Sequence, residues 1–162
     1  MEIDYNKYNI FIFDLDKTLW DTSDKYGQSI WAKQMIPPFR SEGNTVRDDV
    51  DSLCRLRDGV LEYLNFLSSK NMRIGFLSSG FLWGTAYESQ PSIKMLELFN
   101  IIDFFNFKKD LLYKTEPKVG KLEDVGECVF FDDNDNVIAR ASEMQNIRVI
   151  DSKDIEDWRE MI

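Results

Sequence analysis

Four short apolar runs recur along the chain, and polar or helical patterns separate them. The runs cover residues 8–13, 73–77, 127–131 and 148–150. Each run is nearly continuous rather than alternating, which is typical of parallel strands that are covered on both faces. The pattern therefore predicts a buried parallel sheet.

Helical spacing appears between these runs. Val60, Leu61, Leu64 and Leu67 recur at three- and four-residue intervals and predict a helix over residues 59–70. Weaker patterns predict helices over residues 93–101, 134–144 and 154–161. Strands that alternate with helices indicate βαβ units, so the expected fold class is α/β with a mainly parallel sheet.

The stretch 21–58 has no long period, because prolines, glycines and polar residues interrupt it. We expect an irregular insertion or small flap that includes a short hairpin, and not a second domain. The stretch is too short for a large helical cap, and 162 residues suit one domain spanning residues 1–162.

Composition excludes several classes of function. The chain has 20 basic and 29 acidic residues and a net charge of −9, which argues against nucleic-acid or anionic-membrane partners. It has no histidine, which excludes Ser-His-Asp and Cys-His mechanisms. Cys54 and Cys128 are too far apart in sequence to indicate a zinc site or a disulfide framework. With neither a signal-like N-terminus nor an apolar run of about 20 residues, we expect a cytoplasmic protein. The oligomeric state stays open.

Polar residues follow three of the apolar runs. Asp14 and Asp16 follow the first run, Ser78 and Ser79 the second, and the pair 132–133, both aspartates, the third. Ligands of open parallel sheets bind beyond the carboxyl ends of the strands, so we expect these groups to converge. Asp14 and Asp16 would project to the same side. Two negative charges at such a short distance repel each other, which predicts a cation between them. The flap 21–58 would lie next to this site.

These groups suit the hydrolysis of a phosphate monoester, whose charge must be neutralised before a nucleophile can attack. Asp14 could attack phosphorus and form an aspartyl-phosphate, while Asp16 could act as the acid and base. Mg²⁺ prefers oxygen ligands. The candidate metal ligands are Asp14, Asp16, Asp132 and Asp133, with Asp133 or Asp132 completing the site beside Asp14.

Two further groups could contact the phosphoryl group. Ser78, at a strand end, can donate a hydrogen bond to a phosphoryl oxygen. Lys118 can supply a mobile positive charge to the nucleophile and the phosphoryl group. Each has a plainer interpretation, since serines are common in loops and a lysine at a helix start is usually solvated. Trp20, Trp31 and Trp83 are candidates either for the cleft or for the core.

Taken in order, these pieces resemble the haloacid dehalogenase superfamily of phosphotransferases. Residues 14–18 match its DxDx[TV] motif, and Ser78, Lys118 and the acidic pair 132–133 match the other three motifs. Within the superfamily, the chain resembles the magnesium-dependent phosphatase (magnesium-dependent acid phosphatase) family over almost its whole length. The segments that carry this likeness are 16–20, 37–39, 45–48, 96–99 and 130–133.

The resemblance implies a Rossmann-like three-layer sandwich without a large cap domain. It also implies Mg²⁺ as cofactor and a small phosphorylated metabolite or a phosphotyrosine-type group, free or on a phosphoprotein, as substrate. The chain departs from the family at Ser79, where the family carries arginine. Ser78, Ser79 and Lys118 are then the candidate substrate-binding residues, and Arg47 is a candidate to replace the missing guanidinium.

Other functions fit the same residues. A nucleotide or polynucleotide-end phosphatase of the same superfamily is one, although the acidic charge disfavours a polynucleotide. A phosphate- or protein-binding module without turnover is another. Phosphoryl transfer to an acceptor other than water would use every one of these groups. The carboxylates could also cap turns or helices without any chemistry.

Overall fold

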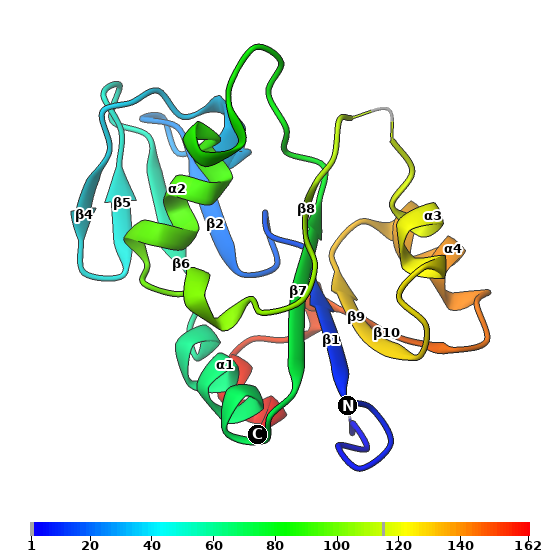
Figure 1. The fold of residues 1–162 in the computed structure, drawn as a ribbon. Helices are drawn as coiled ribbons and strands as arrows, with labels where there is room; N and C mark the ends of the chain where they lie inside the picture. Colours follow the sequence, from blue (N-terminus) through cyan, green and yellow to red (C-terminus); the bar gives the residue numbers. More distant parts are fainter. Residues whose placement is uncertain (1, 115) are drawn as a thin grey trace.

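A five-stranded parallel sheet forms the centre of the computed structural model, which describes residues 2–114 and 116–162 (Figure 1). The order of the strands is β10-β9-β1-β7-β8, and each neighbouring pair is parallel. Their bounds are Ile10–Phe13 for β1, Arg73–Ser78 for β7, Lys109–Leu111 for β8, Cys128–Asp132 for β9 and Ile147–Asp151 for β10. The predicted α/β class with a parallel sheet is confirmed.

Strand β1 is buried on both faces, as its continuous apolar run predicts. Phe11 and Phe13 pack into one core with the side chains of α1 (Val60–Ser69) and α2 (Pro91–Leu98). Ile10 and Ile12 pack into a second core with Leu122 and other side chains on the opposite side. Alternate residues of one strand therefore hold two separate layers together.

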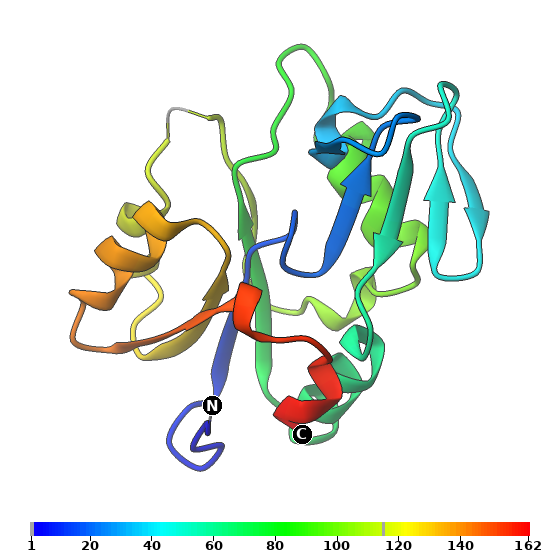
Figure 2. The same ribbon diagram turned by 180° about the vertical axis from the view of Figure 1, so that it is seen from behind.

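Helices cover the two faces of the sheet and make a three-layer, Rossmann-like arrangement (Figures 1 and 2). Helices α3 (Lys118–Glu123) and α4 (Asp135–Ser142) lie together on one face, and α1 lies on the other with the chain's C-terminal end. The predicted helix over residues 59–70 is confirmed, although Leu61 is 41% exposed. No helix of the described ranges is both long enough and apolar enough to cross a membrane.

The prediction of an irregular stretch over residues 21–58 is wrong. The segment forms most of a second, antiparallel sheet of five strands in the order β3-β2-β6-β5-β4. The bounds are Trp20–Ser23 for β2, Ser29–Ile30 for β3, Arg40–Glu42 for β4, Thr45–Arg47 for β5 and Leu53–Leu56 for β6. Strands of two to four residues show too little alternation to be detected, and the central β2–β6 pairing joins residues far apart in sequence. Among the described residues we find no large cap domain.

The helix predicted over residues 154–161 is also wrong, because two short 3₁₀ helices, η4 (Ser152–Asp154) and η5 (Trp158–Met161), stand there instead. The side chains of Asp151 and Asp157 accept hydrogen bonds from backbone N–H groups two residues ahead and start these turns. The buried residues Ile155, Trp158 and Met161 recur every three positions, which suits 3.0 residues per turn.

The direction of the strand order reverses between β1 and β9. From β1 the chain moves to β7 and then β8 on one side, and it returns to β9 and β10 on the other. Connections that leave a sheet in opposite directions open a crevice at the carboxyl ends of the two strands. Asp14 directly follows β1, and β9 ends at Asp132, so the crevice opens beside both carboxylates.

Candidate active site

A cavity of about 450 Å³ opens at the carboxyl ends of the parallel strands. All seven site residues expected from the sequence line it: Asp14, Asp16, Ser78, Ser79, Lys118, Asp132 and Asp133. They lie at or just after the ends of β1, β7 and β9 and at the start of α3, and the most distant two, Asp14 and Asp133, are 119 residues apart in sequence. The fold thus brings the predicted groups into one place.

Asp14 is held rigidly at the end of β1. Its backbone N–H donates to the carbonyl of Phe131 at 2.8 Å and continues the ladder to β9. Its Oδ1 accepts a hydrogen bond from Lys118 Nζ at 2.9 Å, and its Oδ2 accepts one from the Thr18 hydroxyl at 3.4 Å. The carboxylate is 4% exposed, so its position is set by these partners rather than by water.

Lys118 joins two buried carboxylates. Its Nζ lies 2.9 Å from Asp14 Oδ1 and 2.8 Å from Asp132 Oδ2, and the residue is only 8% exposed. The solvated alternative for this lysine is therefore wrong. Burial lowers the pKa of Lys118, but the carboxylates of Asp14 and Asp132 outweigh it and raise the pKa above the ordinary value. The ammonium stays charged at neutral pH.

Asp14, Asp132 and Asp133 form a group that can hold a metal ion. One oxygen from each lies within 4.8 Å of the others. Burial, opposed by Lys118, raises the pKa of Asp14 to about 6; burial and the charge of Asp14 raise the pKa of Asp132 to about 6 as well. Three ionised carboxylates beside one ammonium group have a net charge of −2, and all the potential metal ligands are oxygen atoms. This donor set fits a hard divalent cation such as Mg²⁺.

Asp16 has different partners. Its Oδ1 accepts hydrogen bonds from the backbone N–H of Ala32 at 2.8 Å and from Trp20 Nε1 at 3.0 Å. Burial raises its pKa to about 6, although these two hydrogen bonds act in the opposite direction. The Asp16 side chain is not part of the three-carboxylate group. Its contacts instead tie the loop after β1 to η1 (Ala32–Gln34) in the flap.

Ser78 is the last residue of β7, and Ser79 follows it. Ser78 is 2% exposed and Ser79 is partly exposed, and both line the cavity. Strand β7 lies on one side of β1, and β9 with its carboxylates lies on the other. Gly80 follows, and a Cβ atom there would lie 3.1 Å from the Ser92 hydroxyl on α2. The glycine therefore lets the loop after β7 pass close to this helix.

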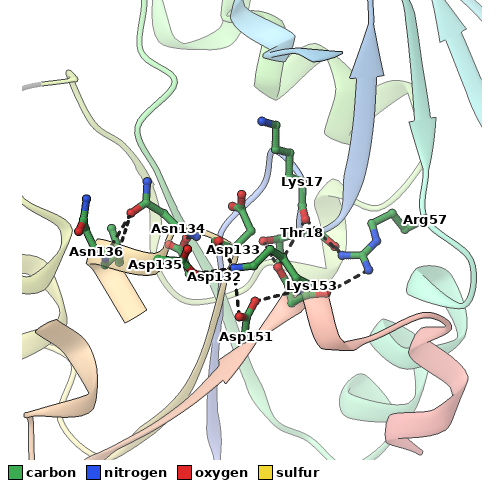
Figure 3. Close-up of polar contacts among 12 residues, drawn as sticks. Lys17, Thr18, Arg57, Asp132, Asp133, Asn134, Asp135, Asn136, Asp151 and Lys153 are labelled. Atoms are coloured by element: carbon green, nitrogen blue, oxygen red, sulfur yellow. Dashed lines mark hydrogen bonds and ion pairs between the residues drawn. The ribbon is translucent and has the colours of Figure 1, made fainter. Parts of the chain in front are cut away.

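Lys153 is a site-supporting residue that the sequence did not reveal (Figure 3). Its Nζ donates to the backbone carbonyl of Asp133 at 2.6 Å and forms ion pairs with Asp135 and Asp151. Asn134 caps α4 by accepting hydrogen bonds from the N–H groups of residues 136 and 137. These contacts fix the backbone on which Asp132 and Asp133 stand.

Arg57 supports the other side of the site in the same way. Its guanidinium donates to four backbone carbonyls, those of Lys17, Thr18, Ser152 and Ile155. Figure 3 shows Arg57 beside Lys17 and Thr18. The carbonyls of Lys17 and Thr18 belong to the loop that carries Asp16. No local sequence pattern marks Arg57, because its acceptors are main-chain groups distant in sequence.

We expect Arg57→Ala to lower the free energy of unfolding by about 2–4 kcal/mol, because several carbonyls lose a charged donor. Chemical denaturation measures this. Arg55→Ala is the matched control, since Arg55 is exposed and forms a surface ion pair with Asp58. This variant should lower the free energy of unfolding by about 0–1 kcal/mol. Equal losses in the two variants would contradict the role given to Arg57.

Arg47 does not reach the site. It lies on β5, forms an ion pair with Glu42 at 3.2 Å and does not line the cavity. The hypothesis that Arg47 replaces the missing guanidinium is therefore wrong. The cations that do line the cavity besides Lys118 are Lys17, Lys33, Lys114 and Arg140.

The aromatic candidates separate into different environments. Trp20 is fully buried and belongs to the core, while Trp83 is 82% exposed and does not line the cavity. Trp31 lines the cavity and is 47% exposed.

No protein-family model matches the chain, and no curated protein shows significant similarity to it.

Proposed function

We propose that the protein is a Mg²⁺-dependent phosphomonoester hydrolase that works through an aspartyl-phosphate. One observation carries the proposal: the buried carboxylate of Asp14 contacts Lys118 and belongs to a group of three carboxylates, with Asp16 two residues away. This combination supplies a nucleophile, positive charge for the phosphoryl group and an acid in one cavity.

In the first step, an oxygen of Asp14 forms a bond to phosphorus and the bond from phosphorus to the leaving oxygen breaks. Asp16 donates its proton to that oxygen. In the second step, Asp16 accepts a proton from water as the water attacks phosphorus, and the bond to Asp14 breaks. A pKa of about 6 suits Asp16 for both directions of transfer near neutral pH.

The residues that would hold the metal are Asp14 and Asp133, with Asp132 assisting. Both oxygens of Asp132 already accept hydrogen bonds, from Lys118 and from the N–H of Asn134, which leaves Asp133 as the freer ligand. Bound Mg²⁺ would neutralise phosphoryl oxygens and thereby lower the repulsion of the incoming nucleophile. Lys118 and Ser78 would contact the remaining phosphoryl oxygens.

Release of p-nitrophenol from p-nitrophenyl phosphate tests the proposal. We expect turnover that requires Mg²⁺ and stops when EDTA is added. An absence of turnover with Mg²⁺ bound, for this compound and for a panel of aliphatic and tyrosyl phosphates, would contradict it.

We further expect Mg²⁺ to raise the unfolding temperature more at pH 7 than at pH 5. Asp14 and Asp132, with pKa values of about 6, are mostly protonated at pH 5 and ionised at pH 7. Protons therefore compete with the metal below pH 6. At a hundredfold excess over Kd, binding would add about 2.7 kcal/mol to the free energy of unfolding.

Asp133→Asn should remove most of this Mg²⁺ effect, whereas Asp103→Asn, at an exposed position outside the cavity, should keep it. Differential scanning fluorimetry at both pH values measures the shifts. An equal shift at the two pH values, or an undiminished shift in Asp133→Asn, would overturn the metal assignment.

A further inference from the structure

Two lysines converge on one indole ring in the wall of the cavity. The Nζ atoms of Lys17 and Lys33 lie 5.8 Å and 5.3 Å from the ring centroid of Trp31. All three residues line the cavity. Ammonium groups at this distance from an indole ring are attracted by its electron-rich face, so Trp31 keeps both cations at the cavity wall.

Among the described residues, the two ammonium groups line the cavity without an acidic side chain paired to either of them. Across the ranges 2–114 and 116–162, neither Lys17 nor Lys33 forms an ion pair, although the chain has nine more acidic than basic residues. Lys118, which also lines the cavity, is by contrast paired with the carboxylates of Asp14 and Asp132. The pair at Trp31 is therefore available for an anion that enters the cavity.

The backbone fixes the position of Lys17. Its N–H donates to the carbonyl of Trp20 at 2.8 Å, its own carbonyl accepts from Arg57, and its φ is 61°, in the left-handed region. Figure 3 shows the side chain extending away from the Arg57 and Lys153 contacts. The backbone at Lys17 is therefore held by hydrogen bonds on both sides of the residue.

The two lysines lie beside the group that we assign as the acid. Lys17 follows Asp16 in sequence, and Ala32, whose N–H binds Asp16 Oδ1, stands between Trp31 and Lys33. Asp16 must contact the leaving oxygen if it donates a proton to it. The lysine pair is therefore on the side of the cavity that receives the leaving group, not the transferred phosphoryl group.

We propose that Lys17, Lys33 and Trp31 form a subsite for a second anionic group on the substrate. The inference rests on the proposed function and narrows it: the preferred substrate is a small phosphomonoester whose alcohol part carries a carboxylate or a further phosphate. A neutral leaving group would leave the two ammonium groups in the cavity wall without a counter-charge. An anion there would form charge-assisted hydrogen bonds with both lysines.

A matched pair of substrates tests the subsite: 4-(carboxymethyl)phenyl phosphate and its carboxamide, which have nearly the same shape. With Mg²⁺, we expect kcat/KM to be about tenfold to a hundredfold higher for the carboxylate, as expected for hydrogen bonds to a charged group. The double variant Lys17→Gln/Lys33→Gln should lose this preference, because kcat/KM for the carboxylate should fall about tenfold to a hundredfold further than kcat/KM for the carboxamide. The bisphosphate of butane-1,4-diol, compared with 4-hydroxybutyl phosphate, tests a phosphate in place of the carboxylate.

Lys7→Gln/Lys70→Gln is the control variant. It removes the same charge from two exposed lysines that also lie over aromatic rings, Tyr8 and Phe66, but near the amino ends of the strands. It should keep the preference for the carboxylate. Equal kcat/KM for the two substrates, or equal losses for both in Lys17→Gln/Lys33→Gln, would overturn the subsite; the latter would place the lysines on the transferred phosphoryl group.

Calorimetry separates failure of the subsite from failure of the hydrolase. The ligands are 4-(carboxymethyl)benzylphosphonate and its carboxamide, which cannot be hydrolysed, added to the Mg²⁺-loaded protein. If no phosphate ester is turned over, tighter binding of the carboxylate that depends on Lys17 and Lys33 would support the subsite and contradict the hydrolase. No turnover and no difference in binding would overturn both.

Discussion

Asp14→Asn is expected to lower kcat by about 10⁴-fold or more, because an amide oxygen cannot replace the attacking carboxylate. The substitution keeps the shape of the side chain and removes one charge from a crowded buried group. We therefore expect the free energy of unfolding in EDTA at pH 7 to stay equal or to rise. Steady-state kinetics on p-nitrophenyl phosphate and chemical denaturation measure the two effects.

Asp103→Asn makes the same chemical change at an exposed position and should leave kcat unchanged. Asp14→Asn with more than a tenth of the normal kcat would show that Asp14 is not the nucleophile. A loss of both activity and folding would point to a structural role for this carboxylate, since Thr18 and Lys118 both bind it.

Lys118→Met has the second large expected effect. It removes the cation between Asp14 and Asp132, and leaving buried charges unpaired typically costs about 3–5 kcal/mol. We expect a loss of this size in the free energy of unfolding at pH 7 in EDTA. We also expect kcat/KM to fall by about 10²- to 10³-fold, because the phosphoryl group loses a charged donor.

The stability loss in Lys118→Met should be smaller at low pH. The folded-state pKa values of Asp14 and Asp132 lie above the ordinary value of 3.8 even with the lysine present. A carboxyl whose pKa is raised on folding favours the folded state at low pH and loses that advantage as the pH rises through its folded pKa. Removing the lysine raises these pKa values further, so the cost of the variant should grow between pH 4 and pH 7.

Lys121→Met is the control for that variant, because Lys121 is an exposed lysine on the same short helix. It should leave both the free energy of unfolding and kcat/KM nearly unchanged. Similar losses at positions 118 and 121, or a cost for Lys118→Met that does not depend on pH, would contradict the buried ion-pair account.

The parallel sheet could be predicted from the sequence because each central strand carries its own signal. Residues 10–13 and 128–132 are buried throughout, and buried strands must be continuously apolar. Strand β8 and the antiparallel sheet give no such signal. Strands such as Arg40–Glu42 are exposed along their whole length, so nothing in their residues distinguishes them from a loop.

The residues of the candidate site could be predicted for a related reason. Asp14, Ser78 and Asp132 end strands or follow them directly, and parallel strands bring their carboxyl ends to one edge. Lys118 had a weaker sequence signal, because its partners Asp14 and Asp132 are 104 and 14 residues away. The spacing of the motifs alone does not show that this lysine is buried.

The supporting residues could not be predicted. Arg57 and Lys153 act through backbone carbonyls, which every residue has, so no side-chain pattern identifies their partners. The convergence of Lys17 and Lys33 on Trp31 depends on the flap, whose fold is set by pairing across the antiparallel sheet. Contacts of this kind follow from tertiary structure and not from local spacing.

Mass spectrometry of acid-quenched Asp16→Asn after mixing with Mg²⁺ and p-nitrophenyl phosphate tests the central claim most directly. p-Nitrophenolate leaves without help from an acid, but water needs a base to attack the phosphorylated enzyme, so the intermediate should accumulate. We predict one phosphoryl group per chain, carried by Asp14 and removed by hydroxylamine. Continued release of p-nitrophenol with no phosphoryl group on Asp14 would contradict covalent catalysis by this residue.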